Sequence, residues 1–180
     1  GQLTAAELAR IDLGQRQGYA TLAEALDAFP EARFNIDVKD PAAAAPTAEA
    51  ILAAGATGRV LITSFSGVRR LAAVRRLPGV ATSLSSFGVV VTVLAARLGS
   101  SRLVARAMRD VHAIQIPQRV LGISTTAPRS IAAVHAAGKE IHVWTINDPA
   151  VMRALLDRGV DGIVTDRADL ALDVVRRRVA

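Results

Sequence analysis

The clearest hydropathy pattern in the chain is a strand, a helix and a second strand over residues 139–166. Apolar and polar residues alternate over 140–146, which predicts the first strand. Asp148 then offers a side-chain cap, and apolar residues recur at helical spacing until Gly159 ends the helix. Residues 163–165 form the next strand. Because the helix carries the chain back to the same end of the sheet, the two strands are expected to be parallel.

The same pattern of strand and helix repeats along most of the chain. We expect six strands, over residues 34–39, 59–65, 80–84, 113–116, 140–146 and 163–165. Helices are expected over 42–54, 66–77, 130–137, 149–158 and 168–177, with one broken or two short helices over 87–110. Two capping boxes, at Thr4 to Glu7 and at Thr21 to Glu24, open short helices before the first strand.

Strands about 20–30 residues apart, each followed by a helix, are typical of repeated βα units. A doubly wound open sheet can hold six strands, but no Gly-rich turn follows the first strand to hold a pyrophosphate. An eight-stranded barrel needs about 250 residues on average, and six units are three quarters of it. Spacing alone leaves the open sheet and the incomplete barrel as equal alternatives.

The composition is apolar for a single domain of 180 residues. Hydrophobic residues make up 51% of the chain and the mean hydropathy is +0.33. Either the sheet is buried on both faces, or something outside this chain covers part of its apolar surface. No apolar run reaches the about 18 residues of a membrane span. The longest apolar run, residues 87–98, is expected to be a buried helix. The favoured location of the protein is the cytoplasm. The absence of Cys excludes disulfides and thiol catalysis.

The formal net charge is +6, and Lys39 and Lys139 are the only lysines among the 22 basic residues. Aromatic residues make up 3% of the chain, too few for a surface that stacks on bases, so we expect no nucleic-acid partner. The basic groups at 69–70, 75–76 and 176–178 are interpreted as solvated helix ends.

The strand over residues 34–39 carries the most informative polar residues. Asn35, Asp37 and Lys39 share one face, where a parallel sheet is normally apolar. Asp37 and Lys39 lie about 6.6 Å apart along the strand, at the carboxyl end where parallel α/β proteins place their sites. The pair is either a buried ion pair, or a carboxylate for a hard cation beside an ammonium for an anionic ligand. We favour the second interpretation, because a lone buried pair is costly.

Polar and aromatic residues near other strand ends extend this candidate site. They are Ser64, Phe65, Gln115, Trp144 and Asn147. The three histidines, His112, His135 and His142, lie on a helix or at strand starts, so they predict no catalytic triad. Asp161 and Asp166 are interpreted as turn and cap residues.

Several motifs together resemble the glycerophosphodiester phosphodiesterase family. They are TLAEALDAFP (21–30), FNIDVKD (34–40), LITSFS (61–66), VRRLAAVRRLPGV (68–80), AIQIP (113–117) and the long segment over 135–170. They follow the order of the family over nearly the whole chain. The resemblance implies a TIM barrel, and therefore favours the incomplete barrel over the open sheet.

The resemblance also implies an activity and its site. The family hydrolyses glycerophosphodiesters to an alcohol and glycerol 3-phosphate with a divalent cation, often Ca²⁺ or Mg²⁺, and two histidines act as acid and base. By this resemblance Asp37 is a metal ligand, Lys39 binds the substrate phosphate and Trp144 lines the mouth of the site. Ser64, Phe65 and Gln115 are weaker matches to substrate-binding positions.

The motifs with which the family opens do not occur in this chain. They include the two catalytic histidines and two of three metal carboxylates, so no catalytic residue is assigned. We therefore expect one domain over residues 1–180 that lacks the first two strands of eight, and no activity from this chain alone. Its open strand edges, near Phe34 and Ile163, predict self-association. Two alternatives remain: a non-catalytic binding module, and a phospholipase that is similar to sphingomyelinase D.

Overall fold

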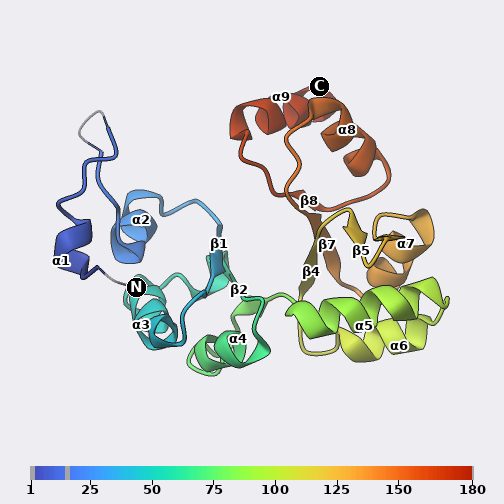
Figure 1. Ribbon diagram of the computed structural model, residues 1–180, viewed down its shortest axis with the longest axis horizontal. Helices are drawn as coiled ribbons and strands as arrows, with labels where there is room; N and C mark the ends of the chain where they lie inside the picture. Colours follow the sequence, from blue (N-terminus) through green and yellow to red (C-terminus); the bar gives the residue numbers. More distant parts are fainter. Residues whose placement is uncertain (1–2, 15–16, 180) are drawn as a thin grey trace.

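The computed structural model describes residues 3–14 and 17–179 (Figure 1). The strands are β1 (Phe34–Asp37), β2 (Val60–Thr63), β3 (Ala81–Thr82), β4 (Ala113–Ile116), β5 (Arg119–Val120), β6 (Ile123–Ser124), β7 (Glu140–Val143) and β8 (Gly162–Ile163). The helices are α1 (Ala5–Leu8), α2 (Leu22–Ala28), α3 (Ala44–Ala53), α4 (Gly67–Val74), α5 (Ser86–Arg97), α6 (Ser101–Ala107), α7 (Pro128–Ala136), α8 (Pro149–Asp157) and α9 (Ala168–Val179), with 3₁₀ turns η1 (Pro41–Ala43) and η2 (Thr57–Arg59).

Six strands run parallel, in two sheets ordered β1-β2-β3 and β4-β7-β8. An isolated parallel bridge between Ser83 and Ala113 joins the sheets, because Leu84 N–H donates to the Ala113 carbonyl. The strand order is therefore β1-β2-β3-β4-β7-β8. In the part of the chain that the structure describes, β1 pairs on one side with β2 and β8 pairs on one side with β7, so the barrel is not closed. The expected α/β fold is confirmed.

Two apolar clusters form the core, one for each sheet. The first packs α2, α3 and α4 against β1 and β2, and includes Leu26, Ile51, Ala73 and Ile62. The second packs α5 to α9 against β4 and β7, and includes Val104, Ile114, Ile141, Met152 and Leu155. The helices cover one face of each sheet (Figure 1). Residues of the other face, among them Asn35, Asp37 and Gln115, line a cleft.

Local signals in the sequence place most element ends correctly. Thr21 caps α2 in a complete capping box with Glu24, whose pKa is lowered by the hydrogen bonds from the Thr21 backbone and side chain. Asp148 caps α8, and Gly159 follows its end with φ of +93°. Ser100 caps α6, so the apolar region over 87–110 is two helices rather than one.

The strands are shorter than the sequence predicts, and one helix is less buried. β7 ends at Val143 instead of 146, and β8 begins one residue earlier than expected, at Gly162. The expectation of a buried helix over 87–98 is wrong for one face of α5, since Phe87 is 82% exposed and Leu98 is 79% exposed. Within residues 3–14 and 17–179, no helix combines the length and the hydropathy needed to cross a bilayer.

Two of the basic groups are solvated as expected, but Arg69 and Arg70 are not. Both lie in the first turns of α4 and are partly buried. Arg69 donates to the Lys39 carbonyl, and Arg70 donates to Thr82 Oγ1 at 3.1 Å. Burial lowers the pKa of the Arg70 guanidinium, against a smaller opposing effect of Asp110. These side chains therefore hold α4 against the ends of β1 and β3.

Arg59 links α2 to the sheet of β1, β2 and β3 through side-chain hydrogen bonds. Its guanidinium donates to the carbonyls of Leu26, Phe29 and Ala32 at 2.7–3.0 Å, and it lies 5.4 Å from the centre of the Phe34 ring. These bonds satisfy carbonyls at and after the end of α2, where intrahelical donors run out.

Replacing Arg59 with Met keeps the apolar stem and removes the three charged donors. We expect the free energy of unfolding to fall by about 2 kcal/mol, because hydrogen bonds to charged groups contribute about 1.5–3 kcal/mol each and are partly solvated here. Urea denaturation measures this loss. Arg75→Met, on an exposed side chain after α4, is the matched control, and an equal effect of both changes would contradict the role of Arg59.

Candidate active site

A cleft of about 510 Å³ opens at the carboxyl ends of the parallel strands. Its lining residues are Asn35, Asp37, Lys39, Thr63, Ser64, Phe65, Leu84, Ser86, Val89, Val90, Gln115, Pro117, Val120, Trp144, Thr145 and Val164. Six of the candidate site residues that the sequence indicates are among them, namely Asp37, Lys39, Ser64, Phe65, Gln115 and Trp144, whereas Asn147 is not. They lie on or just after β1, β2, β4 and β7. The structure thus brings together residues that lie up to about a hundred positions apart in the chain.

Asp37 and Lys39 face the cleft together, as the alternation in β1 predicts. Asp37 Oδ2 lies 3.9 Å from Lys39 Nζ, and the Lys39 side chain is 81% exposed. An ion pair at this distance, with an ammonium in water, contributes little to stability. The two charges are therefore available to a ligand rather than committed to each other.

One oxygen of Asp37 fits the ligand chemistry of a hard cation. Asp37 Oδ1 is buried and has no hydrogen-bond partner among the described residues, which is costly unless another group occupies the position. Ca²⁺ requires six to eight oxygen ligands. Within residues 3–14 and 17–179, no three His, Cys, Asp or Glu residues gather closely enough to complete such a set. The chain offers one carboxylate ligand of a larger site.

Apolar and aromatic side chains also line the cleft. Phe65 and Trp144 meet edge to face, with ring centres 6.0 Å apart and planes at 79°. Phe65 is 60% exposed, and Val89, Val90 and Val120 continue the wall. A cleft with both charged and apolar lining residues suits a ligand that has a charged group and an apolar part.

Ser64 lines the cleft, but its hydroxyl is already engaged. The side chain is 2% exposed, and Oγ donates to the Val38 carbonyl at 2.7 Å while it accepts from Ser66 N–H. Ser64 therefore fixes the end of β1, between Asp37 and Lys39, against β2. The sequence reading missed Thr63, which lies in register with Asp37 on the same face. The alternation along β2 is the signal that could have found it.

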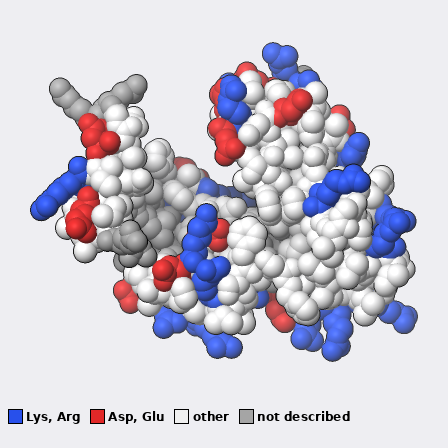
Figure 2. All heavy atoms as spheres, in the orientation of Figure 1, with Lys and Arg blue, Asp and Glu red and all other residues white. Residues whose placement is uncertain are grey.

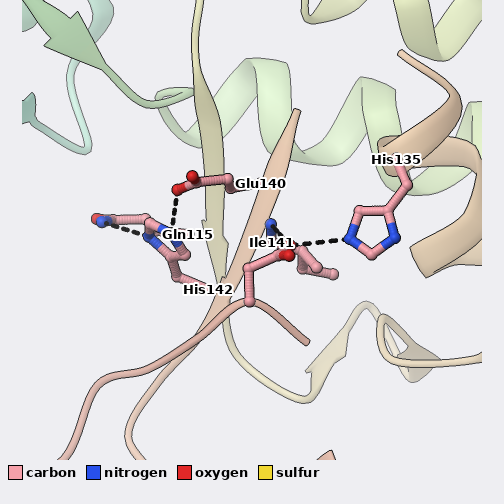
Figure 3. Close-up of polar contacts among 6 residues, drawn as sticks. Gln115, His135, Glu140, Ile141 and His142 are labelled. Carbon is pink, nitrogen blue, oxygen red and sulfur yellow. Dashed lines mark hydrogen bonds and ion pairs between the residues drawn. The ribbon is translucent and has the colours of Figure 1, made fainter. Parts of the chain in front are cut away.

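Gln115 connects the cleft to the opposite end of the strands. Its amide nitrogen lies 3.3 Å from His142 Nδ1, and His142 Nε2 lies 3.0 Å from Glu140 Oε2 (Figure 3). A neutral imidazole with its proton on Nε2 satisfies both contacts, since the amide then donates to Nδ1. Gly162 makes room for this ring, because a Cβ there would come within 2.7 Å of it. The amide of Gln115 is thus bonded to His142, which lines the hollow at the amino ends of the strands, rather than to Asp37 or Lys39.

The histidines lie outside the cleft in the described part of the chain. His112 and His142 line a second hollow of about 590 Å³ at the amino ends of the strands. His135 lies on α7, and its Nε2 lies 2.9 Å from Asp161 Oδ2 (Figure 3). The same oxygen accepts from Ile141 N–H at 2.8 Å, so Asp161 links α7 to the start of β7.

Asn147 and Asp166 pair with each other beyond the ends of β7 and β8. Asn147 Oδ1 accepts from Thr165 Oγ1 and from Asp166 N–H, and its amide donates to Asp166 Oδ2 at 3.1 Å. Asn147 therefore braces two loops and does not line the cleft. Asp166 is the partner of Asn147 in these contacts.

Comparison with known proteins gives consistent relatives. Residues 1–170 match the glycerophosphoryl diester phosphodiesterase family. A probable glycerophosphodiester phosphodiesterase 2 of Mycobacterium tuberculosis is 42% identical over 173 residues, which cover 96% of this chain and 66% of the relative. The chain thus spans just under two thirds of the length of that protein.

Solved structures share the fold at low sequence identity. A glycerophosphodiester phosphodiesterase from Parabacteroides distasonis superposes with a TM-score of 0.73 at 18% identity, over 98% of this chain and 72% of that one. An Oleispira antarctica phosphodiesterase, solved with the product sn-glycerol-3-phosphate, gives 0.67 at 20% identity, over 95% and 70%. With the match over residues 1–170, these findings show that the chain belongs to the glycerophosphoryl diester phosphodiesterase family.

Proposed function

We propose that this chain forms the substrate-binding part of a glycerophosphodiester phosphodiesterase, which hydrolyses its substrate to an alcohol and glycerol 3-phosphate. The observation that carries the proposal is the single cleft that gathers Asp37, Lys39 and Trp144. The family match and the names of the relatives support it. The glycerol 3-phosphate bound in the Oleispira antarctica phosphodiesterase is the product that this reaction would release.

Each side chain of the cleft has a distinct task in this proposal. Asp37 Oδ1 would hold a divalent cation, Ca²⁺ or Mg²⁺, which would supply positive charge to the phosphodiester. Lys39 Nζ binds a phosphoryl oxygen and stabilises the negative charge that grows as water adds to phosphorus. Phe65 and Trp144 pack against the carbon chain of the glycerol or of the alcohol and exclude water from it.

The proton transfers of the reaction require groups that this cleft does not contain. Water must lose a proton as it attacks phosphorus, and the departing alkoxide must gain one. General acid and base groups contribute about 10²–10⁴-fold each. In the described part of the chain, no histidine lines the cleft, so we expect this chain alone to release no product.

We further propose that the six parallel strands are part of an eight-stranded barrel. β1 and β8 each have one strand neighbour within residues 3–14 and 17–179, and two more strands between them would close the ring. The relatives, of which the chain covers 66–72%, are long enough to supply them. The same strands would bring the remaining metal ligands and the acid and base to the cleft.

A second candidate is a binding module without catalysis. It is favoured by the same absence of histidine from the described lining of the cleft. Such a module would hold a phosphoester through Lys39 and Trp144, and its open edges at β1 and β8 would favour self-association. Phosphoester binding is common to both candidates, so turnover distinguishes them. A phospholipase that is similar to sphingomyelinase D is a further alternative, and it would act on a different phosphodiester.

The experiment compares this chain with a chimaera. The chimaera joins two segments. The first is the part of the Mycobacterium tuberculosis relative that precedes the region aligned with this chain, and the second is this chain from Gly1 onward. Release of glycerol 3-phosphate from glycerophosphocholine is measured with Ca²⁺, with Mg²⁺ and with chelator. We expect turnover from the chimaera with cation and none from the chain alone. A folded chimaera that binds glycerol 3-phosphate but hydrolyses no diester would favour the binding module instead.

A further inference from the structure

The outer face of α5 is apolar and exposed. Phe87 is 82% exposed, Val91 37%, Leu94 42% and Leu98 79%. Their spacing of four, three and four residues places them in one stripe along the helix. A helix on the outside of an α/β fold normally presents polar side chains to water there, so this stripe, which we call the α5 stripe, needs a covering partner.

The α5 stripe begins at the rim of the cleft. Val89 and Val90, from the first turn of α5, line the cleft wall. Ser86 N–H donates to the Phe65 carbonyl at 3.1 Å, so the exposed ring of Phe65 adjoins the start of the helix. Any partner that covers the stripe therefore also lies beside the mouth of the cleft.

The two helices α5 and α6 carry basic but no acidic residues. Residues 86–109, which include both helices, contain four arginines and no Asp or Glu. Arg97, Arg102 and Arg106 are exposed on α5 and on the adjoining α6. Figure 2 shows a white surface over α5, with mostly blue side chains along the edge beneath α4, α5 and α6.

We propose that the α5 stripe and its flanking arginines dock on an anionic lipid surface. Apolar side chains that enter the interface and arginines that attract anionic headgroups are the two contributions that bind such helices to membranes. Docking through the α5 stripe would then place the mouth of the cleft next to the bilayer. This docking does not depend on the proposed hydrolysis.

A second copy of the chain fits this face less well. A twofold contact through α5 would place a face with Arg97, Arg102 and Arg106 against an identical face. Neither α5 nor α6 carries an Asp or Glu to pair with these arginines, and like charges oppose association. Additional strands would not cover the face either. They would join at β1 and β8, whereas α5 connects β3 to β4 at the middle of the strand order.

The test is sedimentation of the purified chain with vesicles of phosphatidylcholine, alone or mixed with phosphatidylglycerol. We expect binding to the mixed vesicles that weakens between about 0.1 M and about 1 M salt as screening shortens the range of the charges. Leu94→Gln with Leu98→Gln should weaken binding at least about tenfold, because apolar burial is lost. Arg97→Gln, Arg102→Gln and Arg106→Gln should each weaken it about fivefold.

Matched controls use exposed residues of the same types on α9. Leu172→Gln with Val175→Gln, and Arg176→Gln with Arg177→Gln, should leave vesicle binding unchanged. Circular dichroism and thermal melting verify that every variant folds. Absence of vesicle binding by the folded chain, or equal losses in the α5 and α9 variants, would overturn the proposal. So would a dimer in sedimentation equilibrium that the Leu94 and Leu98 changes dissociate.

Discussion

Asp37→Asn in the chimaera should lower the rate of glycerol 3-phosphate release by about 10³-fold, which is about 4 kcal/mol of transition-state stabilisation. Asn keeps the shape of the side chain and loses its charge, so Oδ1, which is buried without a partner among the described residues, becomes a poor ligand for a hard cation. Initial rates over a series of Ca²⁺ and Mg²⁺ concentrations measure the effect. We expect the cation dependence to move to higher concentrations as well.

Asp40→Asn is the matched control for this change. Asp40 lies three residues further on and caps η1, where its Oδ1 accepts from Ala42 N–H at 2.8 Å. Asn serves almost as well as Asp at a cap, and Asp40 does not line the cleft. Turnover in this variant should equal that of the parent. Full activity of Asp37→Asn at limiting cation would contradict the assignment of Asp37 as a ligand.

Lys39→Met should lower kcat/KM for the diester by about 10²-fold, because it removes a positively charged hydrogen-bond donor to the phosphoryl oxygens, on which negative charge develops. The side chain is 81% exposed and its pairing with Asp37 is loose, so the change should leave the free energy of unfolding nearly the same. Steady-state kinetics of the chimaera give the first quantity and urea denaturation gives the second. Lys39→Arg should restore part of the rate, since it keeps the charge and shifts its position.

Lys139→Met provides the control, since it removes the other lysine of the chain. Lys139 lines the hollow at the amino ends of the strands, away from Asp37. If both lysine variants lost the same fraction of activity, the loss would reflect the change in net charge. That result would contradict the specific role that we give to Lys39.

The position of the charged pair was predictable because the alternation of a strand is a simple geometric rule. Three polar residues on one face of β1 could point only into the hollow, since the opposite face packs against α2 and α3. The caps at Thr21 and Asp148 were predictable for a similar reason, because both act within three residues of the chain.

The hairpin of β5 and β6 was missed, because its turn carries an unusual residue. Leu121 and Gly122 form the turn with φ of +49° and +75°. Asn-Gly and Asp-Gly are the usual signals for such a turn, and a bulky residue in the left-handed region costs about 1–2 kcal/mol. Thr125 holds the base of the hairpin, where its N–H donates to Gln118 O and its hydroxyl to Pro117 O. These contacts outweigh the local preference and are not visible in the pattern.

The hydropathy pattern also could not predict that one face of α5 is exposed. A helix that is apolar all round is normally buried, and residues 87–98 contain a single charged residue, Arg97. What the pattern cannot show is how many neighbours such a helix has. In the structure, α6, α7 and β4 cover one side of it and leave the α5 stripe uncovered.

The most direct test of the phosphoester cleft uses the single tryptophan of the chain. Trp144 lines the cleft beside Phe65, so its fluorescence reports on occupancy of the site. Titration of the chain with glycerol 3-phosphate in the presence of Ca²⁺ should give a saturable change in emission that Lys39→Met and Asp37→Asn weaken and Lys139→Met does not. A flat titration, or a response that is the same in all three variants, would show that the cleft is not a phosphoester site.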